Sequence, residues 1–215
     1  MWSLETDLPV KLAIIFMNGV KVDSGPAAYG QINQLAQSYY AKYLDTPISQ
    51  VPGVQHARSF FRAIGIDPTK RRPSSEALLN RAVKNKGLYS VNSLVDVGNW
   101  CSLDFLLPIC VYDADKISGQ VSIRTGREGE FYIGLNNNEV HLHDRYCIAD
   151  ELGPFGSPKT DSQRTAVSTG TRNTVLIIFA PGDYDPKRLR QQAGTFAKRV
   201  LDICGGAVDK TDLMG

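Results

Sequence analysis

The chain has 215 residues, of which 42% are hydrophobic and 21% are charged, and its formal net charge is +2. A chain of this length buries roughly 70% of its unfolded surface, so its core needs neither disulfides nor a metal. So small a net charge excludes a protein that holds nucleic acid by a strong overall basic excess, and leaves only local basic clusters for such contacts.

Helices dominate the first half of the predicted structure. Residues 11–22 read as a buried strand, and the apolar residues that follow recur at helical spacing. We expect helices over residues 26–44, 54–65 and 93–107.

A further helix is predicted within Lys70–Val83, which reads KRRPSSEALLNRAV. Pro73 suits an opening turn, because the amide that it lacks would have no partner there. Ser74 or Ser75 can cap the free amides, and Glu76 lies at the positive end of the helix dipole.

Short, partly alternating segments occupy the second half, which is typical of antiparallel sheets. A polar stretch over 151–172 predicts a long loop, and a buried strand over 173–181 and a final helix over 186–204 follow. The short segments cover residues 108–113, 119–126, 129–135, 139–144 and 145–150. Helices first, sheet later and a helix last predict an α+β fold.

The predicted organisation has three parts. Residues 1–54 are expected to form an N-terminal strand-and-helix extension packed on the core, residues 55–205 the main domain, and residues 206–215 a flexible tail.

The four cysteines, Cys101, Cys110, Cys147 and Cys204, lie in or beside apolar segments without Cys-x-x-Cys spacing. They are expected to be buried thiols in a reducing compartment rather than zinc ligands. The N-terminus has no signal-peptide pattern, and the apolar run Leu12–Met17 is too short to cross a bilayer. We therefore expect a cytoplasmic protein with no metal, no cofactor and no membrane association.

Common catalytic motifs are absent, including the phosphate-binding glycine loop, the nucleophile elbow and the zinc-binding His-Glu-x-x-His helix. Cys110 would act as a nucleophile only with a base beside it, and a buried thiol is the alternative. The polar segment 156–174 lies between two apolar blocks, so it is either a functional loop or a solvated excursion.

One long stretch resembles a known family. Asp96–Trp100 is similar to an Asp-Val-Thr-Asn-Tyr segment of the editing module in the phenylalanyl-tRNA synthetase β subunit, and Pro108–Asp113 is similar to its Pro-x-His-Ala-Phe/Tyr-Asp segment. The similarity runs without a gap from Asp96 to Glu130. Residues 71–79 and 161–165 also resemble free-standing relatives of that module.

The resemblance implies an editing-domain fold, with mixed helices packed on antiparallel and mixed sheets. It implies a trans-editing hydrolase, in which water attacks the ester that joins a wrong amino acid to tRNA. The alternative is a module that binds tRNA or an amino-acid-like ligand without catalysis. The implied partner is the acceptor end of tRNA and not DNA; the sequence leaves the oligomeric state open.

The same resemblance supplies the candidate site residues. Asn99, Arg164 and Thr165 are the candidate catalytic residues, with Asn99 orienting water or the terminal ribose. The expected cleft lies between the stretch around Asn99 and the strand that ends near Ala180. The candidate substrate-binding residues are Gly98, Cys110, Arg124, Glu130, Asp150, Ser162 and Ile178.

Three of these positions depart from the family pattern. Gly98 replaces a threonine, Cys110 replaces a histidine, and Ile178 falls where the family has a glutamate that recognises a tyrosine hydroxyl. A site without that hydrogen bond discriminates weakly, so a different amino acid is expected, or binding without cleavage. Structural alternatives also exist, because Arg124 with Glu130 can form a cross-strand ion pair and Asp150 can cap a loop.

The basic residues in and beside the helix predicted within Lys70–Val83 are the candidate tRNA contacts. Each phosphate that a cation neutralises steepens the salt dependence of binding. The alternative is a solvated helix end. The candidates are Lys70, Arg71, Arg72, Arg81 and Lys84.

Overall fold

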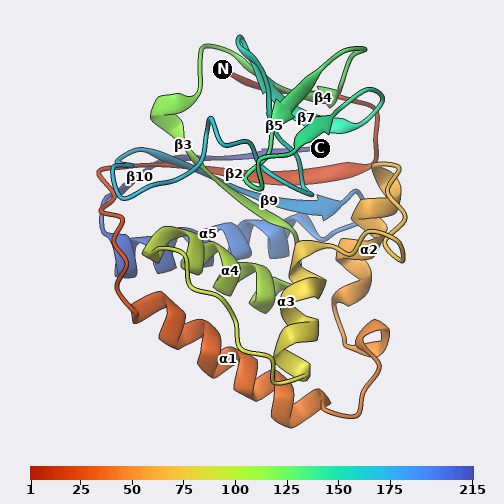
Figure 1. Cartoon of the computed structure of the whole chain (residues 1–215), viewed down its shortest axis with the longest axis vertical. Helices are drawn as coiled ribbons and strands as arrows, with labels where there is room; N and C mark the ends of the chain where they lie inside the picture. The colour runs from red at the N-terminus through yellow and green to blue at the C-terminus, as the bar shows by residue number, and fades with distance from the viewer.

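A computed structural model describes all 215 residues and shows a central sheet between a layer of helices and a second sheet (Figure 1). The order and types of the elements confirm the predicted α+β class. Helices α4 and α5 cover one face of the central sheet, and α1 and α3 pack against α4. The helices are α1 (Ala27–Tyr43), α2 (Val54–Ala63), α3 (Ser74–Val83), α4 (Ser93–Phe105) and α5 (Pro186–Cys204).

The central sheet has the strand order β10-β2-β9-β3, and every neighbouring pair is antiparallel. Because β2 lies inside this sheet, residues 1–54 supply part of the core rather than only a covering extension. The predicted flexible tail is wrong, since residues 207–214 pair with β2 along its free edge. The strands are β2 (Val10–Asn18), β3 (Ile109–Asp113), β9 (Thr174–Pro181) and β10 (Ala207–Met214).

The second sheet has the order β1-β4-β7-β8, in which β1 runs parallel to β4 and the other pairs are antiparallel. The sequence analysis assigned no strand to the residues of β1 or β8. A separate hairpin joins β5 to β6. The bounds are β1 (Trp2–Glu5), β4 (Val121–Thr125), β5 (Phe131–Ile133), β6 (Glu139–His141), β7 (Tyr146–Asp150) and β8 (Gly153–Gly156). Single 3-10 turns occur at Ile48–Gln50 and Ala114–Lys116.

Alternation along the central strands divides the apolar core into two clusters. On β9, Ile178 and its alternate neighbours face α4 and α5, whereas Ile177 and Phe179 face α2 and the second sheet. Successive side chains of a strand point to opposite faces, so a position's parity decides which cluster it joins. This division controls which candidate site residues can meet.

The start of α3 differs from the prediction. Neither Ser74 nor Ser75 caps the helix, and the Ser75 hydroxyl is buried without a partner. Glu76 is buried and accepts two hydrogen bonds of 2.7 Å from the guanidinium of Arg58 on α2. The carboxylate therefore ties α3 to α2 rather than serving only the helix dipole.

Candidate functional site

The expected cleft between Asn99 and β9 is filled by side chains. Val97 and Cys101 of α4 lie in the same buried cluster as Ile178, and all three are fully inaccessible to solvent. The prediction of an open cleft in this place is therefore wrong. The Asn99 side chain itself is half-buried, and its amide has no hydrogen-bond partner within the chain.

Gly98 lies where α4 approaches β3 most closely. A Cβ atom at Gly98 would come within 2.9 Å of Cγ2 of Val111, which is closer than real Cβ contacts. The glycine at this family threonine position thus permits helix and sheet to pack together, and the backbone there does not face a cavity.

Cys110 and Ile178 cannot line one pocket, because they point to opposite faces of the central sheet. Cys110 pairs across the ladder with Ile177 and lies in the other apolar cluster. Burial raises the pKa of the Cys110 thiol well above its ordinary value, and the nearby carboxylate of Asp161 raises it further. The thiol is therefore neutral, and its Sγ lies 3.6 Å from the carbonyl oxygen of Ser157.

Arg164 and Asp150 form a bidentate ion pair. The Nη1 and Nη2 atoms of Arg164 donate to the carboxylate at 2.8 and 2.9 Å, and the Asp150 side chain is fully buried. Burial by itself raises the pKa of Asp150, but the bonds from Arg164 and from the amides of Ser118 and Leu152 lower it overall. Arg164 and Asp150 are bonded to each other, which is the geometry of an ion pair that stabilises the fold.

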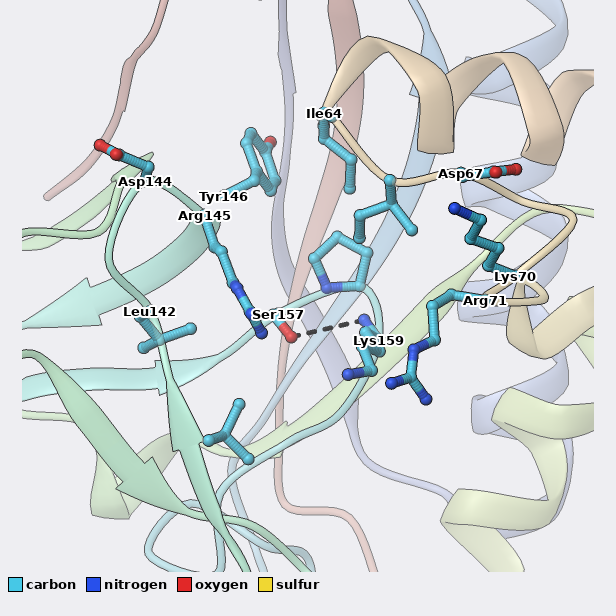
Figure 2. A pocket seen from close by; sticks show the side chains of 14 residues that line it. Ile64, Asp67, Lys70, Arg71, Leu142, Asp144, Arg145, Tyr146, Ser157 and Lys159 are labelled. Carbon is cyan, nitrogen blue, oxygen red and sulfur yellow. Dashed lines mark hydrogen bonds between the residues drawn. The ribbon is translucent and has the colours of Figure 1, made fainter.

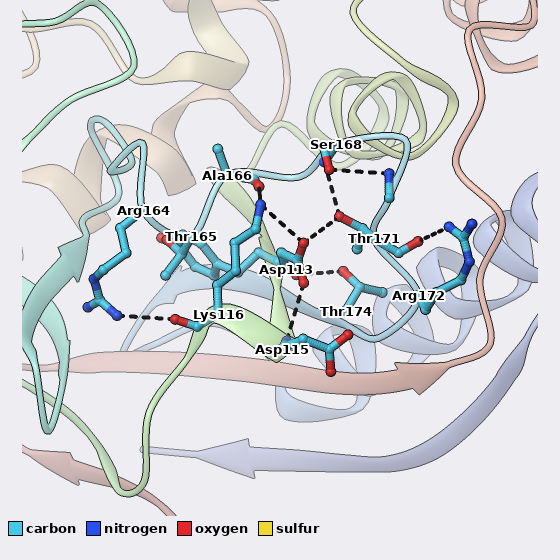
Figure 3. Close-up of polar contacts among 12 residues, drawn as sticks. Asp113, Asp115, Lys116, Arg164, Thr165, Ala166, Ser168, Thr171, Arg172 and Thr174 are labelled. Atoms are coloured by element: carbon cyan, nitrogen blue, oxygen red, sulfur yellow. Dashed lines mark hydrogen bonds and ion pairs between the residues drawn. The ribbon is translucent and has the colours of Figure 1, made fainter.

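The segment 156–174 is anchored rather than solvated (Figure 3). Thr171 donates to the carboxylate of Asp113 at 2.7 Å, and the carbonyl of Thr165 accepts from the Asp113 amide at 3.0 Å. Thr165 and Ser162 are buried, with their hydroxyl oxygens 3.4 Å apart. Neither hydroxyl is placed on an open surface.

Arg124 and Glu130 also pair, through two bonds of 2.8 and 2.7 Å. The bond from Arg124 is the main cause of the lowered pKa of Glu130. The structure therefore places both predicted residues in an ion pair between β4 and the turn before β5, which is not the cross-strand pair that the structural alternative expected.

A cavity of about 330 Å³ opens beside the apolar cluster that faces α2 and the second sheet (Figure 2). Three segments surround it: the α2–α3 connection, the residues from β6 into β7, and the segment after β8. We call it the basic pocket, because Lys70, Arg71, Arg145 and Lys159 line it. Its other lining residues are Ile64, Gly65, Ile66, Asp67, Val140, Leu142, Asp144, Tyr146, Ser157 and Pro158.

A second hollow of about 500 Å³ adjoins the basic pocket and is mostly polar. The two share Arg71, Val140, Arg145 and Lys159, so these residues separate one hollow from the other. Asn136, Asn138, Glu139, His141 and Thr160 complete the second hollow.

The cations of the basic pocket have no acidic partner among the ion pairs of the chain. The Asp67 carboxylate accepts hydrogen bonds from the amide and the hydroxyl of Thr69. The Asp144 carboxylate lies 3.4 Å from Nε2 of His143. In Figure 2 both carboxylates point away from the space between Arg71, Arg145 and Lys159. The lining contains four cations and two carboxylates, which leaves the pocket with a net positive charge.

The predicted tRNA contacts divide into two groups. Lys70 and Arg71 line the basic pocket. Arg72 lies 3.4 Å from Glu76, and Arg81 donates to the carbonyl of Gly87 and stacks on Tyr89. Lys84 is exposed directly after the last residue of α3 and lines neither hollow.

Sequence reasoning missed Arg145 and Lys159. Arg145 is an isolated cation in the short β6–β7 connection, Lys159 is an isolated cation in the long segment after β8, and neither belongs to a basic run that would have drawn notice. No group of three or more histidine, cysteine, aspartate or glutamate side chains is arranged to hold a metal ion. None of the helices combines the length and the apolar character that crossing a membrane would require.

Comparison with known proteins agrees with this fold. Residues 56–199 match the B3/4 domain family. The phenylalanine–tRNA ligase β subunit of Neisseria meningitidis serogroup B is 35% identical over 167 residues, which cover 66% of this chain and 21% of that protein. The β subunit of Brucella abortus is 26% identical over 228 residues, covering 93% and 28%.

A similar fold occurs in an N-terminal fragment of the phenylalanyl-tRNA synthetase β subunit from Pyrococcus horikoshii, with a TM-score of 0.50 and 13% sequence identity. The match covers 100% of this chain and 53% of that fragment. The chain spans between 21% and 28% of the length of the two β subunits named above. Because the family match covers more than half of its residues, this chain belongs to the B3/4 domain family and is a domain like that of the phenylalanyl-tRNA synthetase β subunit.

Proposed function

We propose that this chain binds tRNA through the basic pocket. The observation that carries the proposal is the set of cations at the pocket, Lys70, Arg71, Arg145 and Lys159, none of which forms a salt bridge within the chain. Phosphate contacts supply most of the affinity of a protein for RNA, and they require cations that the protein has not already neutralised.

The low net charge is compatible with this proposal, because the charge is concentrated rather than spread. At +2 overall, the chain attracts RNA weakly at a distance. Binding is then limited to the region around the pocket, and the relatives named as tRNA ligase subunits make tRNA the RNA to test first.

A charge-removal experiment tests the proposal. Arg71→Ala and Arg145→Ala should each weaken tRNA binding and reduce the slope of log K against log salt by up to about 0.7–0.9 for each lost phosphate contact. Arg190→Ala is the matched control, because Arg190 is an exposed arginine on α5 outside both hollows. Equal salt slopes in all three variants and the wild type would refute the assignment.

Ester hydrolysis on mischarged tRNA is the second candidate function. It is favoured by the position of the basic pocket beside Ser157, whose carbonyl lies 3.6 Å from Sγ of Cys110, the position that resembles the family's histidine. An aminoacyl ester is already reactive, so an oriented water with suitable hydrogen-bond donors is sufficient chemistry.

A set of tRNAs, each charged with a wrong amino acid, tests this second function. Loss of the ester on at least one of them, faster than the spontaneous rate, is the expected result. If every ester survives, the chain binds tRNA without editing it.

A further inference from the structure

One edge of the central sheet is open. Strand β10 lies at the end of the order β10-β2-β9-β3 and pairs only with β2. No backbone hydrogen bond links residues 207–214 to any segment other than β2. The first five residues of β10 are exposed, and none of its residues lines the basic pocket or the second hollow. The edge is therefore a free surface apart from the residues proposed to bind tRNA.

The ladder of the sheet shows which backbone groups of β10 are unpaired. In an antiparallel sheet, the residues of a strand direct their amides and carbonyls alternately to the neighbours on either side. The carbonyl of Pro9 accepts from the amide of Gly182, so the odd-numbered residues of β2 bond to β9. The even-numbered residues of β2 bond to β10, opposite its even-numbered residues from 210 to 214. Thr211 and Leu213 therefore direct their amides and carbonyls away from the sheet.

The charged side chains of this edge suit a second copy of β10. A lysine on an edge strand discourages pairing, because an incoming strand would desolvate its charge. Here Asp212 lies two residues beyond Lys210 on the same face, and its carboxylate accepts from Nζ of Lys210 at 2.8 Å. Both side chains are partly exposed. A second β10 that runs in the opposite direction presents the same two charges in reverse order, so each charge can meet its opposite.

The charges also select the register of such a pairing. With Thr211 opposite Thr211 of the second copy, each Lys210 is opposite an Asp212, which gives two attractive pairs on one face. With Lys210 or Asp212 opposite itself, like charges meet directly, and that destabilises a sheet. With Leu213 opposite itself, Asp212 is opposite Met214 and no charged pair forms. Only the first register satisfies both the charges and the unpaired backbone groups.

We propose that the chain forms a symmetric dimer in which the β10 strands of two copies pair in antiparallel fashion about Thr211. The two four-stranded central sheets then become one continuous sheet. Leu213 and Met214 pack against opposite apolar clusters and are only partly buried in the single chain, so the added strand covers side chains on both faces. A twofold contact of this kind is closed, and no longer assembly follows from it.

Two single variants test the dimer by analytical ultracentrifugation over a range of protein concentrations. Lys210→Asp places carboxylates at all four charged positions of the contact, and Asp212→Lys places ammonium groups there. Each variant alone should dimerise about tenfold more weakly than the wild type or worse, because two attractive pairs become repulsive. An equimolar mixture of the two variants should recover dimerisation, because every carboxylate then meets an ammonium group. Recovery in the mixture also excludes a folding defect.

Arg190→Asp is the matched control, because it reverses one exposed charge on α5 by the same amount and should dimerise like the wild type. A wild-type chain that stays monomeric at every concentration would overturn the proposal. Dimers that persist equally in both single variants would place the contact on another surface and overturn it as well. A mixture that dimerises no better than the single variants would overturn the antiparallel pairing about Thr211.

Discussion

Replacing Arg164 by methionine should destabilise the fold rather than remove a catalytic group. The Asp150 carboxylate accepts from Nη1 and Nη2 of Arg164 at 2.8 and 2.9 Å, from the Ser118 amide at 2.8 Å and from the Leu152 amide at 3.0 Å. Methionine removes the two charged donors, and the two amides remain. The variant therefore leaves a buried carboxylate without its counter-ion.

The magnitude follows from the burial of the two partners. Breaking a fully buried ion pair costs about 3–5 kcal/mol, because the remaining charge stays desolvated. The Asp150 side chain is fully buried, but 32% of the Arg164 side chain is exposed, so water can reach part of the vacated space. We therefore expect the free energy of unfolding to fall by about 2–3 kcal/mol.

Urea unfolding at two pH values measures this effect. In the wild type the lowered pKa of Asp150 contributes stability that is present above its unfolded pKa and is lost as the pH falls through the folded pKa. Arg164→Met should raise the pKa of Asp150, because the bonds from Arg164 then no longer outweigh the effect of burial. The variant should consequently lose most stability near neutral pH and least in acid.

Asp150→Asn is the matched control, because it keeps the shape of the side chain and removes the buried charge. In the Asp150→Asn background, Arg164→Met should cost clearly less than in the wild type. If Arg164→Met leaves stability unchanged at neutral pH, the structural assignment of this pair is refuted. Loss of ester hydrolysis with full stability would return Arg164 to the catalytic role that the sequence suggested.

Two further variants test other features of the interior. Gly98→Ala should destabilise the wild type by about 1 kcal/mol, since overpacking against Val111 outweighs the helix preference of alanine. In a Val111→Ala background, Gly98→Ala should instead stabilise the protein by about 1 kcal/mol. Equal effects on urea unfolding in both backgrounds would contradict the close approach of α4 to β3. Burial raises the pKa of Asp161 to about 6, so the stability of the wild type should fall as the pH rises from about 4 through 6. Above pH 6, Asp161→Asn should therefore be more stable than the wild type, by at most roughly 3 kcal/mol. The same advantage for Asp161→Asn at pH 4 and pH 8 in thermal unfolding would contradict this assignment.

The prediction for Ile178 shows how sensitive a site assignment is to register. The resemblance matched a family glutamate to position 178, but Cys110 faces Ile177 across the ladder, and the two β9 residues point into different clusters. A shift of one residue along a strand exchanges its faces. A gapped alignment of a strand can therefore place a site residue on the wrong side of the sheet.

The sequence by itself determined the α+β class, the helices and the buried strands of the central sheet, because periodic apolar residues and helix-terminal signals are local properties of the chain. It also determined Lys70 and Arg71 as candidate contacts, since they stand in an obvious basic run. Only the tertiary structure decided that Arg145 and Lys159 join Arg71, whereas Arg164 is engaged by Asp150. The physical reason is that a charge is free or paired according to neighbours far away in the chain, and sequence spacing does not determine those neighbours.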